Sequence, residues 1–216
     1  MLSEIISPLL ESGIVTKVVA VMTELVTKIG PYIKKVFEFL FSKVPEFLDR
    51  VEPIIDVAEM AFMAKNMNIS SEILGQKASK FAGKAEDFDN FKDYVNTVEN
   101  SDIDVKAKEN LTPEEYHLYK TLGMAIKIAN LAKEINAEIK PGFLEGMVNL
   151  GADKDPKLAK EMWNLVKEEN KQPDLKSYLK NELNSKEDIE AYEFLKEALE
   201  KTGEEKTVTE LLRGAE

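Results

Sequence analysis

The only histidine of the chain, His117, lies in the stretch EEYHLYK, and the chain has no cysteine. An imidazole titrates near neutral pH and can act as a general base, and Glu114, three positions earlier, would share its helix face. No nucleophile motif accompanies this pair, so we expect instead a solvent-facing histidine near the start of a helix. The lack of cysteine and of a second imidazole also excludes thiolate chemistry, zinc fingers, iron–sulfur clusters and histidine-bearing di-iron bundles.

Two other stretches could bind ligands, but their spacing argues against it. The acidic run EDFDNFKDYVNTVENSDID, residues 86–104, fails as an EF-hand loop, because counting from Asp87 puts Lys92 at the glycine position and Val98 at the glutamate position. We expect a solvated helix face capped by Asp87, with a looser cation site as the alternative. The glycines of KPGFLEGMVNLGADKDP, residues 140–156, lack the Lys-Ser/Thr of a P-loop and predict helix breaks and caps. The sequence thus predicts no metal, cofactor or small-molecule ligand.

The charge balance argues against nucleic acid as a partner. The 216 residues include 29 basic and 40 acidic side chains, for a net charge of -11, and the only arginines are Arg50 and Arg213. Phosphate backbones are recognised by clustered positive charge, often by arginine. The hydrophobic content of 44% is enough to bury a sizeable core. We therefore expect a globular protein that does not bind nucleic acid.

The chain shows no signal for export or membrane insertion. Its start, MLSEIISPLLESG, lacks a basic region and a cleavage site, and no run of about 18 apolar residues occurs. We predict a cytoplasmic protein. Tyr178 and Glu182 have a Tyr-x-x-x-Asp/Glu spacing that resembles the export tag of type VII secretion substrates, but those also carry a Trp-x-Gly turn, and Trp163 is followed by Asn164-Leu165. The resemblance assigns no family, and secretion without a leader stays open.

Start and stop signals of helices occur along the whole chain. Capping boxes begin helices at Thr112 and Thr207, Gly30-Pro31 ends one helix and begins the next, and Pro53 should kink or divide another. Gly123, inside a long helix, would allow a neighbouring helix to approach closely. The predicted helices cover, or begin at, residues 14–29, 31–44, 45, 70–81, 87, 112–140, 155, 173, 185–203 and 207. We predict an all-α multi-helix bundle with a hydrophobic N-terminal helical hairpin packed by more polar C-terminal helices.

The first third of the chain is more apolar than the rest. Residues 1–67 carry nine acidic and seven basic side chains, which leaves a net charge of -9 for residues 68–216. We predict a hydrophobic helical head, residues 1–67, that is the core of the same domain as an acidic helical body, residues 68–216. The head has more aromatic side chains than one helix face can hold, which makes some of them candidates for interaction. These candidates are Phe37, Phe39, Phe41, Phe47 and Phe62.

Three coverings would explain the apolar head. If the body covers it, function falls to the acidic outer surface, which would recognise a protein partner by charge complementarity. If another chain covers it, the protein self-associates. If a bilayer covers it, residues 1–67 lie in the membrane interface or form a pore. We predict a non-catalytic protein-interaction or assembly module, with a protein partner or self-association, and keep membrane association through residues 1–67 as the alternative.

Overall fold

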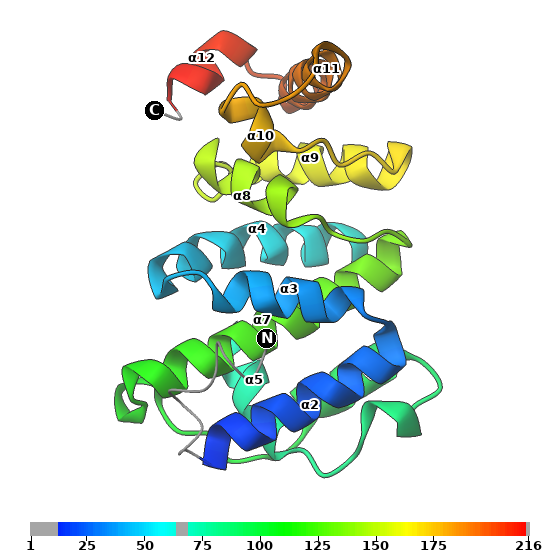
Figure 1. The fold of residues 1–216 in the computed structure, drawn as a ribbon, viewed down its shortest axis with the longest axis vertical. Coiled ribbons are helices and arrows are strands. Elements are labelled where there is room, and N and C mark those ends of the chain that lie inside the picture. The colour runs from blue at the N-terminus through cyan, green and yellow to red at the C-terminus, as the bar shows by residue number, and fades with distance from the viewer. Residues whose placement is uncertain (1–12, 64–68, 215–216) are drawn as a thin grey trace. The chain divides into compact units, whose positions relative to one another are not determined.

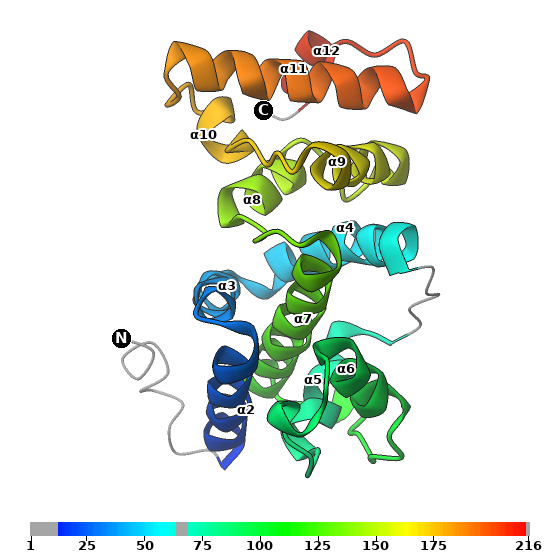
Figure 2. The ribbon, with the colours of Figure 1, turned by 90° about the vertical axis from the view of Figure 1, so that its right-hand side faces the viewer.

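The computed structural model describes residues 13–63 and 69–214, which Figures 1 and 2 show from two sides. These residues form α-helices and two short 3₁₀ helices and contain no strand, so the predicted all-α class is confirmed. The chain divides into two compact units: residues 1–48 with 68–133, and residues 49–67 with 134–216. This division differs from the expected head and body, which stay a prediction.

In the first unit, helices α2 and α5 contact each other, and α7 is buried along most of its length. Helix α2 also contacts α3 and the 3₁₀ helix η2, and α5 also contacts α6. Helices α2 and α3 are separated as predicted, because Gly30 adopts a positive φ of 109° between them, and Pro31 stands at the N-cap position of α3. The elements of this unit are α2 (Gly13–Ile29), α3 (Tyr32–Phe41), α5 (Ser71–Lys80), η2 (Ala85–Asp87), α6 (Phe91–Asn100), η3 (Lys108–Asn110) and most of α7 (Pro113–Ile135).

Helices α5 and α7 cross with their backbones in contact. A Cβ atom added at Gly123 would lie 1.7 Å from the carbonyl oxygen of Ser71, and one at Gly75 would lie 1.9 Å from that of Tyr119. No residue larger than glycine fits at either position without moving a helix. The predicted close approach at Gly123 is confirmed, and Gly75 is its partner on the other helix.

The second unit surrounds Trp163, whose indole Nε1 donates a hydrogen bond of 3.0 Å to the carbonyl of Ile54. The rings of Phe62 and Phe143 meet the indole edge-on. Helix α8 contacts α10, α9 contacts α11, and α11 contacts α10 and α12. The elements of this unit are most of α4 (Pro45–Met63), α8 (Pro141–Asn149), α9 (Pro156–Glu169), α10 (Leu175–Leu179), α11 (Ser185–Thr202) and α12 (Val208–Arg213).

Helix α8 corrects the expectation that residues 140–156 hold only breaks and caps. Gly142 and Gly146 lie inside α8, and a Cβ atom at Gly146 would come within 2.2 Å of the Cβ of Leu175 in α10. Sequence signals favoured a break because glycine weakens an isolated helix. In α8 the glycines are required for close packing against α10, and this packing stabilises α8.

The predicted caps are mostly correct. The side chains of Thr112, Asp155 and Thr207 accept hydrogen bonds from the first turns of α7, α9 and α12. The prediction that Asp87 begins a helix as its cap is wrong. Asp87 ends the 3₁₀ helix η2, where its carboxylate accepts a hydrogen bond from the N–H of Lys84. Asn90 caps α6 instead. Pro53 does not divide α4, which runs through it.

The apolar side chains of α2 and α3 are mostly buried. In α2 the buried stripe recurs at helical spacing, and in α3 four of ten residues are buried. The stripes consist of Val15, Val18, Val21, Met22 and Leu25 in α2, and of Ile33, Val36, Phe37 and Leu40 in α3. These apolar stripes of α2 and α3 are therefore part of the core.

Candidate functional site

The five phenylalanines predicted as interaction candidates do not form one surface. Phe37 is buried and stacks on Phe41 with ring centroids 5.9 Å apart. Phe62 is also buried and belongs to the second unit, against Trp163. Phe39, Phe41 and Phe47 are half-buried. Phe37 and Phe62 are thus core residues, because each lies on the inward-facing side of its helix.

Phe39 and Phe47 meet at the turn between α3 and α4. Their rings are edge-on with centroids 6.0 Å apart, and the ammonium of Lys43 lies 4.8 Å from the Phe39 centroid and 5.1 Å from that of Phe47. Val44, between them, is 62% exposed. We call Phe39, Lys43, Val44 and Phe47 the turn cluster. The spacing of four residues from Phe39 to Lys43 and from Lys43 to Phe47 was the sequence signal for it.

His117 is not the solvent-facing residue that we expected. Its ring packs on Phe41 at a centroid distance of 5.5 Å, and Nε2 lies 3.4 Å from the Phe41 carbonyl oxygen. Nδ1 is buried, and no hydrogen-bond partner for it lies among the described residues. No hydrogen bond joins His117 to Glu114 in that part of the chain. The ring fills space between α7 and the end of α3, so the general-base hypothesis gains no geometric support.

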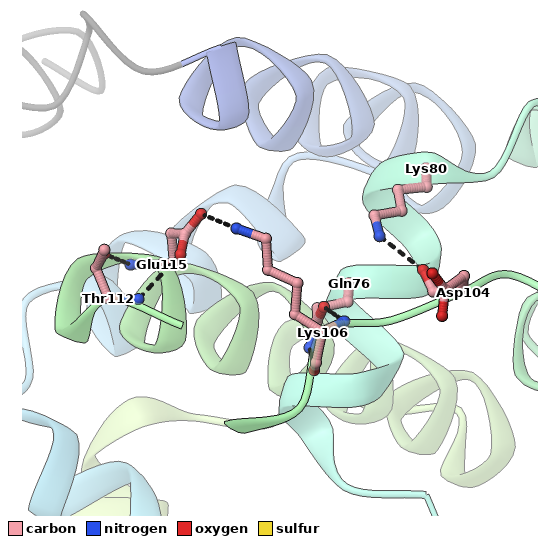
Figure 3. Close-up of polar contacts among 6 residues, drawn as sticks. All are labelled: Gln76, Lys80, Asp104, Lys106, Thr112 and Glu115. Atoms are coloured by element: carbon pink, nitrogen blue, oxygen red, sulfur yellow. Dashed lines mark hydrogen bonds and ion pairs between the residues drawn. The ribbon is translucent and has the colours of Figure 1, made fainter. Parts of the chain in front are cut away.

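The acidic run 86–104 continues into a non-helical segment, residues 101–107, that lies along α5 (Figure 3). The amide of Gln76 pairs with both backbone groups of Lys106, donating to its carbonyl at 3.0 Å and accepting from its N–H at 2.8 Å. Lys80 donates to the carbonyl of Asp104 at 2.6 Å, and Lys77 donates to those of Glu99 and Ser101. Hydrogen bonds from lysine ammonium groups to backbone carbonyls hold this segment against α5.

The far end of the segment is fixed to the start of α7. The Lys106 ammonium lies 2.9 Å from the Glu115 carboxylate, which also accepts from the N–H of Thr112 at 2.9 Å (Figure 3). The hydrogen bond from Lys106 and that from Thr112 lower the pKa of Glu115. Within residues 13–63 and 69–214, no three acidic or histidine side chains are grouped so that they could hold a metal ion.

Large exposed apolar side chains are few in the described part of the chain: Val44, Met60, Ile189 and Tyr192. Two of these lie on α11, where Ile189 is 61% and Tyr192 is 42% exposed. They are three positions apart on neighbouring parts of the helix surface. Ile189 lies on the side away from the buried stripe, and Tyr192 lies at the edge of that stripe, next to Leu195 and Leu199. We call the side of α11 that carries Ile189 and Tyr192 the α11 face. It was missed from the sequence, although apolar residues outside the buried stripe were the available signal.

Charged side chains of both signs, with an excess of carboxylates, surround the α11 face. A hollow that follows Tyr192 along the helix is lined by Glu193, Lys196, Glu197, Glu200 and Lys201. Both lysines already lie in ion pairs, Lys196 with Glu193 at 3.9 Å and Lys201 with Glu168 at 2.8 Å. Three glutamates against two lysines leave the lining of the hollow with a small net negative charge.

The acidity of the protein belongs to the second unit. Its residues include 24 acidic and 15 basic side chains, a net charge of -9, whereas the first unit has 16 and 14, a net charge of -2. Helix α11 contributes six acidic against three basic side chains. Negative potential is thus strongest on the unit that also exposes Ile189 and Tyr192.

Comparison with known proteins finds no match: no family model and no curated protein matches the sequence, and no solved structure matches the fold. Among the described helices, none is both long enough and apolar enough to cross a membrane.

Proposed function

We propose that this protein is a non-catalytic α-helical recognition module whose acidic surface binds a protein partner. The observation that carries the proposal is the separation of its apolar and acidic parts. The apolar stripes of α2 and α3 are core, while the second unit concentrates the negative charge and exposes two large apolar side chains on one helix. Interfaces combine an apolar centre with complementary charge at the rim, which is the composition of the α11 face.

The proposal predicts a partner that is basic and a complex that weakens with salt. The tagged full chain would be recovered from its source cell, the proteins that travel with it identified, and the strongest candidate purified. Calorimetry of that pair should give a dissociation constant that rises steeply when the salt concentration goes from about 50 to about 500 mM, since screening removes charge attraction. Recovery of the chain without any stoichiometric protein would contradict the proposal.

Membrane association through residues 1–67 is the second candidate, and two features of the first unit favour it. The turn cluster exposes Val44 beside two half-buried aromatic rings and a lysine. A hollow on α2 and α3 is lined by Val19, Met22, Thr23, Val26 and Lys34. Aromatic and lysine side chains suit a bilayer interface.

Flotation of the full chain with anionic vesicles separates the two candidates. Recognition of a protein predicts that the chain stays at the bottom of the gradient. If the chain floats, and if Val44→Glu abolishes flotation while Met60→Glu does not, lipid is the partner of the turn cluster. Both substitutions are at exposed positions, so the fold is retained and only the surface changes.

A further inference from the structure

We infer that the α11 face docks a basic amphipathic helix of the partner; this rests on the function proposed above. The face can extend along a long helix, because α11 runs from Ser185 to Thr202. The helix contains no proline or glycine that would interrupt it. A helix packs on another helix through apolar residues three and four positions apart. Ile189 and Tyr192 provide such a pair of exposed apolar residues in the first half of α11.

The charge around the apolar pair selects a cationic occupant. Glu190 lies next to Ile189, Glu193 follows Tyr192, and the carboxylates of the hollow continue for two further turns. The lysines of α11 already form ion pairs with Glu190, Glu193 and Glu197. Six acidic against three basic side chains still leave the helix negative, so an acidic partner helix would meet like charge. A partner with lysine or arginine beside its apolar stripe would instead pair with the carboxylates while its apolar side chains cover Ile189 and Tyr192.

A second copy of this chain is a poorer occupant of the same face. An isologous dimer through α11 would bring two faces together that each carry the excess of carboxylates described above, and like charges oppose such pairing. The segment that fits has the opposite charge. The proposal therefore commits to a different protein, and a dimer formed through α11 would overturn it.

The test uses a synthetic amidated 18-residue peptide with leucines on one helical face and lysines and arginines on the others. The control peptide has the same composition with leucines distributed around the helix, so that total charge is unchanged. Binding to the full chain is measured by fluorescence anisotropy. We expect the amphipathic peptide to bind about tenfold more tightly than the control, because only it presents an apolar stripe.

Variants of the chain then locate the binding. Ile189→Ser with Tyr192→Ser should weaken the amphipathic peptide about tenfold or more, as expected for anchors at the centre of an interface. Met60→Ser is the matched control, because Met60 is exposed, apolar and in the same unit but lies on α4. Glu193→Gln, Glu197→Gln and Glu200→Gln together should reduce the salt dependence of binding. Circular dichroism verifies that each variant is folded.

Three results would overturn the inference. The first is equal affinity for both peptides, and the second is an unchanged affinity in the Ile189 and Tyr192 double variant. The third is a wild-type dimer in analytical ultracentrifugation that is absent in the double variant. The proposed function is judged separately. If the partner recovered from cells binds the double variant as tightly as it binds the wild type, the α11 site fails and protein recognition stands. If no protein is recovered, the function itself fails.

Discussion

At the scale of single residues, the contact between Gly75 and Gly123 is the most restrictive in the first unit. Gly123→Ala places a methyl group where the Ser71 carbonyl oxygen lies, so α5 and α7 must separate. We expect the free energy of unfolding to fall by about 3 kcal/mol, at the upper end of overpacking effects. Urea denaturation measures it as a lower midpoint.

The control for this substitution is Gly13→Ala at the first residue of α2. A Cβ atom there meets nothing within 4 Å, and alanine favours helix over glycine. Its unfolding midpoint should be unchanged or slightly higher. Similar losses from both substitutions would show that the cost at Gly123 is not steric.

Tyr94 makes the free energy of unfolding depend on pH in the alkaline range. Its side chain is buried among Phe81, Phe88 and Phe91, and burial raises the pKa of the phenol far above its ordinary value of 10.0. Above pH 10 the unfolded chain loses this proton and the folded chain keeps it. The stabilisation is therefore complete below pH 10 and is lost as the pH rises, at about 1.4 kcal/mol per pH unit.

Tyr94→Phe keeps the ring packing and removes the ionisable group. Its free energy of unfolding should fall less steeply between pH 10 and pH 11.5 than that of the wild type, in buffers of equal ionic strength. Some slope remains, because burial also raises the pKa of Tyr119 and of Tyr178. Parallel curves for the two proteins would contradict the burial of Tyr94 in the folded state.

At the scale of elements, Arg50 joins α4 to the loop that follows α8 in the second unit. Its guanidinium donates to both carboxylate oxygens of Asp153, at 2.9 and 3.0 Å, and to the carbonyl of Val148. The hydrogen bond with Asp153 raises the pKa of Arg50. This planar fork holds two elements that are about 100 residues apart in sequence.

Lysine cannot reproduce the fork, because an ammonium has no planar pair of donors. Arg50→Lys should therefore lower the free energy of unfolding by about 1 kcal/mol, which thermal denaturation in low salt would measure. Arg213→Lys is the matched control, since Arg213 is the other arginine and is exposed in α12. An equal effect of the two substitutions would mean that the fork adds no stability.

The elements also show what sequence patterns can predict. Starts at Thr112, Asp155 and Thr207 were predictable, because a cap is a local interaction between residues three apart. Helix α8 and the cap at Asn90 were not, because close packing of Gly146 on Leu175 and the turn around Asp87 depend on tertiary contacts. The same holds for the candidate site: apolar content identified the phenylalanines, but only burial separated core Phe37 and Phe62 from the turn cluster.

For the whole molecule, the location of the apolar residues of α2 and α3 decides between protein recognition and membrane association. The sequence showed an apolar first third and left three coverings open. In the folded chain the inward-facing stripes of these two helices are buried, while the net charge of -9 belongs to the unit that carries α11. Protein recognition by that unit is the function we propose, and lipid would be its strongest competitor.

Hydrogen–deuterium exchange of the full chain, with and without anionic vesicles, shows whether the fold or a bilayer covers α2 and α3. It reports protection of the backbone amides of α2 and α3 without truncating the protein. Burial predicts slow exchange of both helices in solution and the same rates when vesicles are added. Exchange of α2 and α3 at the rate of an unstructured peptide in solution, slowing only when vesicles are present, would mean that lipid and not the fold covers these helices.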